Sequence, residues 1–176
     1  MHTFYTRMGQ DSLTNTSSTQ ALTDKKKESL ISAVYIGTIF IVLALIFVVN
    51  TGIWGNIVNF FSSLTLAQVP GIGFSLPAPA NPAGHTQLYT AAFEFSLGMG
   101  ILEIIILAVR ILLRSPFERR AETIENIVFW LGTSYLIITY LVNMILQTEW
   151  FVFWAGLILI AGLAFLARAF ILMARR

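Results

Sequence analysis

Four long runs of apolar residues alternate with more polar segments along the chain. They cover residues 30–49, 88–112, 124–146 and 150–173. A helix needs about 20 mostly apolar residues to cross about 30 Å of hydrocarbon, and each run is long enough. The pattern predicts an all-α integral membrane protein, organised as a four-transmembrane-helix antiparallel bundle.

The segment before the first run has a different character. Residues 1–29 are rich in Ser, Thr, Asn and Gln and show no apolar periodicity. Such a segment cannot bury enough apolar surface to offset the entropy lost on ordering. We therefore expect residues 1–29 to be a polar cytoplasmic tail without fixed structure, and residues 30–176 to form the membrane domain.

The connection between the first two spans, residues 50–87, is the longest loop. Its first part carries apolar residues at helical spacing, which predicts a short helix lying in the outer membrane interface. These residues are Trp54, Ile57, Val58, Phe61 and Leu64. Residues 70–84 contain four prolines and no charge, so we expect an extended or repeatedly turning segment that packs on the bundle or on a partner.

Composition and charge fix the class and the orientation. The chain is 56% hydrophobic and 11% charged, against about 25% charged residues in soluble domains, which excludes an ordinary soluble fold. All eleven Lys and Arg residues fall on one side of the four spans. Since Lys and Arg in short loops stay cytoplasmic, both termini are expected inside, as in a multi-pass protein of the cell membrane. The basic excess therefore does not indicate nucleic-acid binding.

Two acids fall within the second span. Glu94 and Glu103 are nine residues apart, or two and a half helical turns, so they point to opposite faces and cannot form a carboxylate pair. Arg110 is two turns from Glu103, and Arg168 in the fourth span could approach Glu103 if those helices adjoin. Because a buried charge in a membrane is costly, we expect Glu103 to be protonated or hydrogen-bonded in a structural role. The alternatives are an intermolecular contact or an ion or proton pathway, for which these four residues are the candidates.

A second group of polar residues is predicted near the outer face. His85, Tyr89, Asn143 and Glu149 are candidate neighbours of Glu94. A histidine and two carboxylates can bind a divalent ion, but the nine-residue spacing of His85 and Glu94 matches no metal-site motif. We expect no metal, no cofactor and no catalytic residue. The chain has no cysteine, which removes thiolate ligands and thiol nucleophiles.

Small residues in the second and fourth spans permit close helix approach, and packing within the bundle is favoured over a dedicated dimer face. They include Gly98, Gly100, Gly156, Ala161, Gly162 and Ala164.

With no nucleotide-binding or hydrolase motif, the leading hypothesis is a noncatalytic accessory or scaffold subunit of a larger membrane complex. Its expected partners are the lipid bilayer and other membrane subunits, or further copies of the chain. One alternative is a small proton or cation transporter or channel component that uses Glu94 or Glu103. A weaker one is a cofactor-binding or enzyme subunit whose site is completed by another chain.

Overall fold

The computed structural model describes residues 3–143 and 146–174. Residues 144–145 of the predicted third span, together with Arg175 and Arg176, lie outside the described residues. The chain divides into two compact units, residues 1–37 and 38–176.

Four long helices dominate the chain: α1 (Thr3–Val49), α3 (Thr86–Leu112), α4 (Phe117–Leu136) and α5 (Gln147–Met173). Helix α4 continues into a π-helical stretch, η2 (Ile137–Val142). Within the residues that the structure describes, four helical segments are long and apolar enough to cross a membrane: Lys26–Val49, Pro82–Leu112, Phe117–Val142 and Gln147–Met173. In length and composition these helices match the predicted number of spans, although the third begins at Phe117 and ends at Val142 instead of covering 124–146.

The first unit holds the polar beginning of α1. The backbone is helical from Thr3 onward, so the expectation of a segment without fixed structure is not what the structure shows. No glycine or proline occurs between residues 10 and 36, and nothing in that stretch interrupts the α-helical hydrogen-bond ladder.

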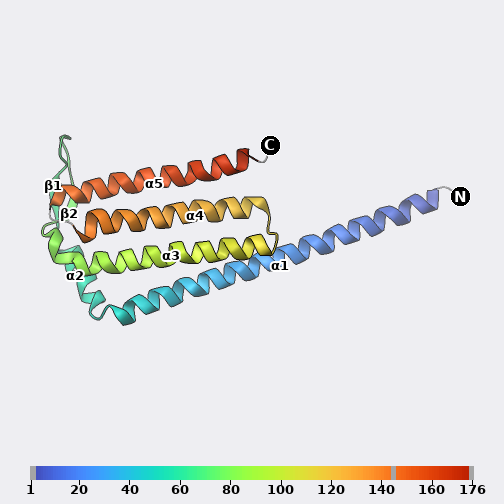
Figure 1. Ribbon diagram of the computed structural model, residues 1–176, viewed down its shortest axis with the longest axis horizontal. Coiled ribbons are helices and arrows are strands. Elements are labelled where there is room, and N and C mark those ends of the chain that lie inside the picture. The colour runs from blue at the N-terminus through green and yellow to red at the C-terminus, as the bar shows by residue number, and fades with distance from the viewer. Residues whose placement is uncertain (1–2, 144–145, 175–176) are drawn as a thin grey trace. The chain divides into compact units, whose positions relative to one another are not determined.

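In the second unit, α4 lies between α3 and α5 and packs along both (Figure 1). Glycines allow the close approach. A Cβ added at Gly100 of α3 would lie 2.9 Å from Cγ of Leu131, and one added at Gly132 of α4 would lie 2.6 Å from Cγ2 of Ile160. Gly156 of α5 meets Leu136 in the same way, at 3.0 Å. By contrast, Gly162 has no atom within 4 Å of an added Cβ.

The loop of residues 50–87 contains a helix and a β-hairpin. Helix α2 (Ile53–Ser62) matches the predicted short helix except for Leu64, which begins the first strand. Strands β1 (Leu64–Gln68) and β2 (Ser75–Pro79) pair antiparallel, from Leu64 opposite Pro79 to Gln68 opposite Ser75. A short 3₁₀ helix, η1 (Pro82–His85), leads into α3. The described residues are mostly helical, consistent with the predicted all-α bundle, and they also contain a two-stranded sheet that was not predicted.

The hairpin turn has the sequence chemistry of a type II turn. Pro70 precedes Gly71, whose φ of 74° is in the left-handed region, and the N–H of Ile72 donates to the carbonyl of Val69 over 3.2 Å. Proline fixes φ for the first central position and glycine tolerates positive φ at the second.

The base of the hairpin is tied to the first turn of α5. The Trp150 Nε1–H donates to the carbonyl of Pro77 at 3.1 Å, and the Gln147 side-chain amide donates to the carbonyl of Pro79 at 2.9 Å. Phe60 of α2 also packs on Trp150, with ring centroids 5.7 Å apart. We call this end of the helices the hairpin end.

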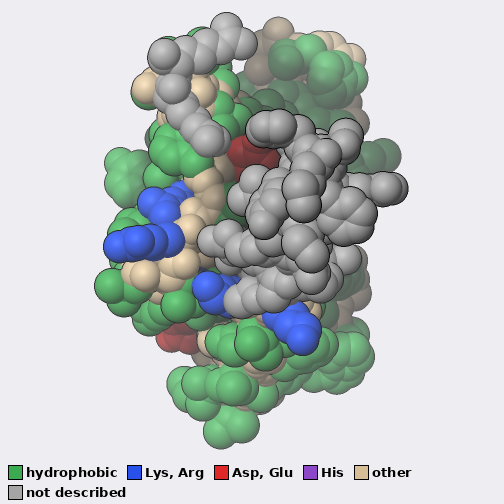
Figure 2. All heavy atoms as spheres, turned by 90° about the vertical axis from the view of Figure 1, so that its right-hand side faces the viewer, with side chains coloured by type: hydrophobic (Ala, Val, Ile, Leu, Met, Phe, Trp, Pro, Cys, Tyr) green, Lys and Arg blue, Asp and Glu red, His purple; other side chains and the backbone are tan. Residues whose placement is uncertain are grey.

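A buried cluster lies beneath these contacts, made of Ala78, Tyr89, Leu136, Ile137, Leu141, Trp150 and Phe153. The opposite end of the helices, which we call the arginine end, carries Arg110, Arg114, Arg119, Arg120 and Arg168. Figure 2 views the molecule from the side to which the arginine end points.

Candidate functional site

A row of polar residues runs along the face of α3 that packs on α4. Tyr89, Ser96, Glu103 and Arg110 recur every seven residues, so each is rotated by only about 20° around the helix from the one before it. The first three are 3%, 4% and 2% exposed. From the sequence, Tyr89 was placed in one group and Glu103 and Arg110 in another, and Ser96 was not singled out as a polar candidate, although the seven-residue spacing is visible in the sequence.

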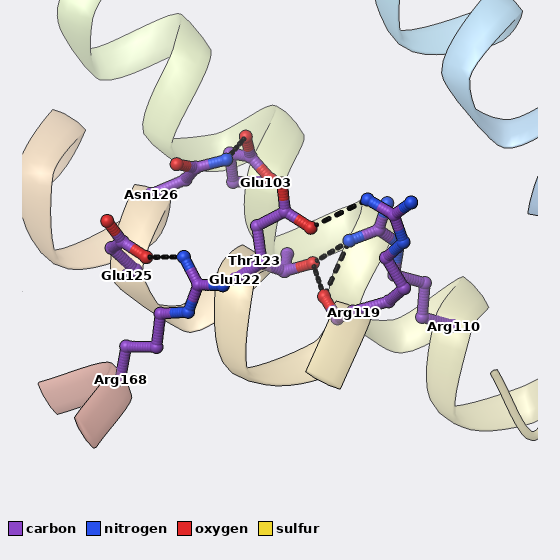
Figure 3. A network of polar contacts seen from close by, with 8 residues as sticks. All are labelled: Glu103, Arg110, Arg119, Glu122, Thr123, Glu125, Asn126 and Arg168. Atoms are coloured by element: carbon purple, nitrogen blue, oxygen red, sulfur yellow. Dashed lines mark hydrogen bonds and ion pairs between the residues drawn. The ribbon is translucent and has the colours of Figure 1, made fainter. Parts of the chain in front are cut away.

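Glu103 is the acid of this row and is almost completely buried. Its Oε1 accepts a hydrogen bond of 2.8 Å from the Asn126 Nδ2–H of α4 (Figure 3). A polar group taken out of water needs such a partner, because an unsatisfied amide or carboxyl costs several kcal/mol in hydrocarbon. The contact joins α3 to α4.

Arg110 joins the same two helices nearer the arginine end. Its guanidinium donates to the Thr123 hydroxyl and, over 2.6 Å, to the carbonyl of Arg119. The Thr123 hydroxyl donates in turn to that carbonyl over 2.8 Å. Helix α4 thus has its first turns fixed to the last turn of α3.

Arg168 contacts α4, not Glu103. Its Nη1 lies 3.0 Å from Oε2 of Glu125, and the Glu125 side chain is 14% exposed. The predicted approach to Glu103 required α3 and α5 to adjoin, but α4 lies between them (Figure 1). The polar contacts therefore run in sequence from α3 to α4 and from α4 to α5.

Glu94 occupies a separate environment. It is exposed, and its Oε2 accepts a hydrogen bond of 3.1 Å from the Asn50 amide, just beyond the end of α1. As the nine-residue spacing predicts, it does not share the environment of Glu103.

Of the four residues predicted as a cluster at the outer face, His85 and Tyr89 are in ring contact, whereas Asn143 and Glu149 make hydrogen bonds within their own segments. His85 Nε2 lies 2.8 Å from the Ser63 hydroxyl oxygen, and its ring packs edge-on against Phe60 and Tyr89. The Asn143 side chain donates to the carbonyl of Ile138 over 2.8 Å. Glu149 accepts the N–H of Leu146 over 3.1 Å at the start of α5. In residues 3–143 and 146–174, no three His, Asp or Glu residues are grouped as metal ligands would be.

The pairing of Ser63 with His85 has the residue types of a nucleophilic dyad but not its proton arrangement. The Ser63 hydroxyl also lies 2.8 Å from the carbonyl of Phe60, which can only accept. A hydroxyl has one proton, and Ser63 donates it to the carbonyl of Phe60. The donor in the contact between Ser63 and His85 is therefore the imidazole N–H. An activating base would have to accept from the serine. The contact instead fastens the end of α2 to the start of α3.

The apolar helices define a multi-pass α-helical membrane protein whose polar groups pair between neighbouring helices. Comparison of the chain with protein-family models, with curated proteins and with solved structures found no match.

Proposed function

We propose that the protein is a noncatalytic accessory or scaffold subunit of a larger membrane complex. The observation that carries the proposal is the contrast between the two sides of α5. One side packs on α4 through Gly156, Phe153 and Ala164. The other exposes Ala155, Gly162 and Ala169 at seven-residue intervals.

Small residues at that spacing support a helix contact because lipid gives little hydrophobic drive for association. Close backbone approach and the resulting van der Waals packing select partners in a membrane. Larger apolar side chains flank the exposed small residues, among them Ile158, Leu159 and Leu166. A partner helix could thus pack closely against the backbone of α5 at these small residues and contact the apolar side chains on either side of them.

The proposed orientation in the cell membrane rests on the arginine end. Lys and Arg side chains are visible among apolar ones when the molecule is viewed from that side (Figure 2). Because basic residues near span ends are retained in the cytoplasm, we place this end and both termini inside.

Native mass spectrometry of complexes extracted gently from the native membrane tests the proposal. Wild type is compared with Gly162→Ile, in which an added side chain meets no atom of this chain within 4 Å of its Cβ. Leu159→Ile is the matched control on the same exposed face. Wild type and control should carry a defined companion chain, and Gly162→Ile should lose it while keeping its helical circular dichroism. A wild-type monomer without companions, or a companion retained by Gly162→Ile, would contradict the proposal.

The alternative of a proton or cation transporter is supported by Glu103, since an acid that is 2% exposed within a span is a functional candidate. In proteoliposomes containing the purified protein, transport should be lost in Glu103→Gln and kept in Glu94→Gln if Glu103 carries the ion. Wild-type transport unaffected by Glu103→Gln would rule out this role.

A further inference from the structure

The hairpin end exposes large apolar side chains on elements that are not spans. On the hairpin, Leu66 is 77%, Ile72 50% and Phe74 51% exposed; on α2, Trp54 is 68% and Phe61 66% exposed. Exposed apolar side chains gathered on neighbouring elements mark a contact with a partner or a membrane.

The depth of these elements follows from α5. Its 27 residues measure about 40 Å, whereas the hydrocarbon layer is about 30 Å thick and the full bilayer about 40–45 Å. A centred α5 therefore extends about 5 Å beyond the hydrocarbon at each end. Trp150, three residues after Gln147, falls at the boundary between hydrocarbon and headgroups, a depth that tryptophan favours.

Trp150 also sets the level of the hairpin and of α2. Its indole N–H donates a hydrogen bond of 3.1 Å to the carbonyl of Pro77, and the centroid of its ring lies 5.7 Å from that of the Phe60 ring. Both elements are thereby attached at the same boundary. The hairpin lies across the helix direction and extends sideways past α5 (Figure 1), so its turn reaches beyond the surface that the helices of this unit cover.

The composition of this region suits a lipid environment. Residues 50–84 contain no Asp, Glu, Lys or Arg, so entry into the boundary region requires no charge to lose water. Pro77 and Pro79 have no N–H, and their carbonyls already accept hydrogen bonds from α5. The outer edge of β2 therefore brings no unsatisfied amide donor at these two positions into the membrane.

We propose that the hairpin and α2 form one membrane-inserted collar, with Ile72, Phe74 and Phe61 in the acyl-chain boundary of the leaflet at the hairpin end. The occupant of this apolar surface is lipid, and the attraction does not depend on lipid charge, because the collar carries no cation for anionic headgroups. Next to the collar, α5 also exposes the apolar side chains of Val152 and Trp154, within about one turn of Trp150. The proposal concerns the single chain and goes beyond the proposed accessory function.

Spin labels on single introduced cysteines test the collar directly, since the natural chain has no cysteine. The variants are Ile72→Cys, Phe74→Cys and Phe61→Cys. Asn59→Cys is the control, because two residues of α-helix correspond to about 200° of rotation and place it on the opposite side of α2 from Phe61. Each purified full-length variant is reconstituted in phosphatidylcholine vesicles, and collisions with oxygen and with a water-soluble nickel chelate are measured.

We expect the ratio of oxygen to nickel collisions to be several-fold higher at 72, 74 and 61 than at 59, and unchanged when anionic lipid is added. Nickel-dominated collisions at 72 and 74 would place the hairpin in water and overturn the proposal. Protection of 72 and 74 from both reagents would show that protein covers them, which would also overturn it. Only this chain is present, so neither result bears on whether a native partner binds α5.

Discussion

The contact between α3 and α4 at Gly100 gives the most direct quantitative test of the described packing. Gly100→Ala adds a methyl group whose carbon would lie 2.9 Å from Cγ of Leu131. Gly162→Ala adds the same group to the exposed side of α5, where no atom lies within 4 Å. Both glycines are within long helices, so the two substitutions share every effect of alanine on the helix itself.

The expected magnitude follows from two terms. Replacing glycine by alanine within a helix stabilises it by up to about 1 kcal/mol. This term is common to both variants and cancels when they are compared. Forcing an extra methyl group into a packed interface costs about 1–3 kcal/mol, because Leu131 must leave its rotamer or the helices must separate. Gly100→Ala should therefore be about 1–3 kcal/mol less stable than Gly162→Ala.

The measurement is reversible unfolding of the purified chain in mixed micelles with increasing sodium dodecyl sulfate, followed by circular dichroism. Gly132→Ala is a second test case at the α4–α5 contact, where the added carbon would lie 2.6 Å from Cγ2 of Ile160. It should resemble Gly100→Ala. Equal unfolding midpoints for Gly100→Ala and Gly162→Ala would refute the close approach of α3 and α4.

Two further substitutions test individual hydrogen bonds. Trp150→Phe removes the donor to Pro77 but keeps an aromatic ring, so hydrogen exchange of the hairpin amides should accelerate about fivefold, the equivalent of about 1 kcal/mol. Trp154→Phe is the control and should leave that exchange unchanged; equal rates in both variants would contradict the role of the bond. Glu103→Gln keeps an acceptor for Asn126 and should unfold near the wild-type detergent concentration. Glu103→Leu leaves the Asn126 amide without this acceptor, and its free energy of unfolding should fall by about 1–3 kcal/mol. Equal loss in both variants would show that the hydrogen bond is not what stabilises the contact.

The spans and α2 were predictable because their signals are local. A run of about 20 apolar residues can satisfy its backbone in a membrane only as a helix or in a closed barrel. The helical spacing of Trp54, Val58 and Phe61 likewise needs no knowledge of the rest of the chain. The opposite environments of Glu94 and Glu103 followed from helix geometry alone.

The hairpin was missed because its prolines argue against a strand. Proline in β2 is tolerated because a two-stranded sheet has only edge strands. The backbone nitrogens of Pro77 and Pro79, which carry no hydrogen, face away from β1, so no hydrogen bond between the strands is lost. The turn Val69-Pro70-Gly71-Ile72 was the available signal.

The partner of Arg168 could not be predicted for a different reason. Sequence does not reveal that α4 lies between α3 and α5, and the choice between Glu103 and Glu125 depends on that order. The start of α4 shows a similar limit. Ser115, Pro116 and Glu118 have the spacing of a capping box with proline at the first helical position. The helix nevertheless begins at Phe117, and its N-cap residue, Pro116, makes no side-chain cap.

The central place of α4 has a consequence for how the protein is made. Helix α4 is the least apolar of the four candidate spans, and its polar side chains find partners on both neighbours. Asn126 meets Glu103, which is synthesised earlier, whereas Glu125 meets Arg168, 43 residues later in the chain. When α4 reaches the membrane-insertion machinery, Glu125 has no Arg168 to pair with. Stable integration of α4 should therefore wait for α5, so that the last two helices enter the lipid as a pair and a chain truncated before Arg168 leaves α4 only weakly retained.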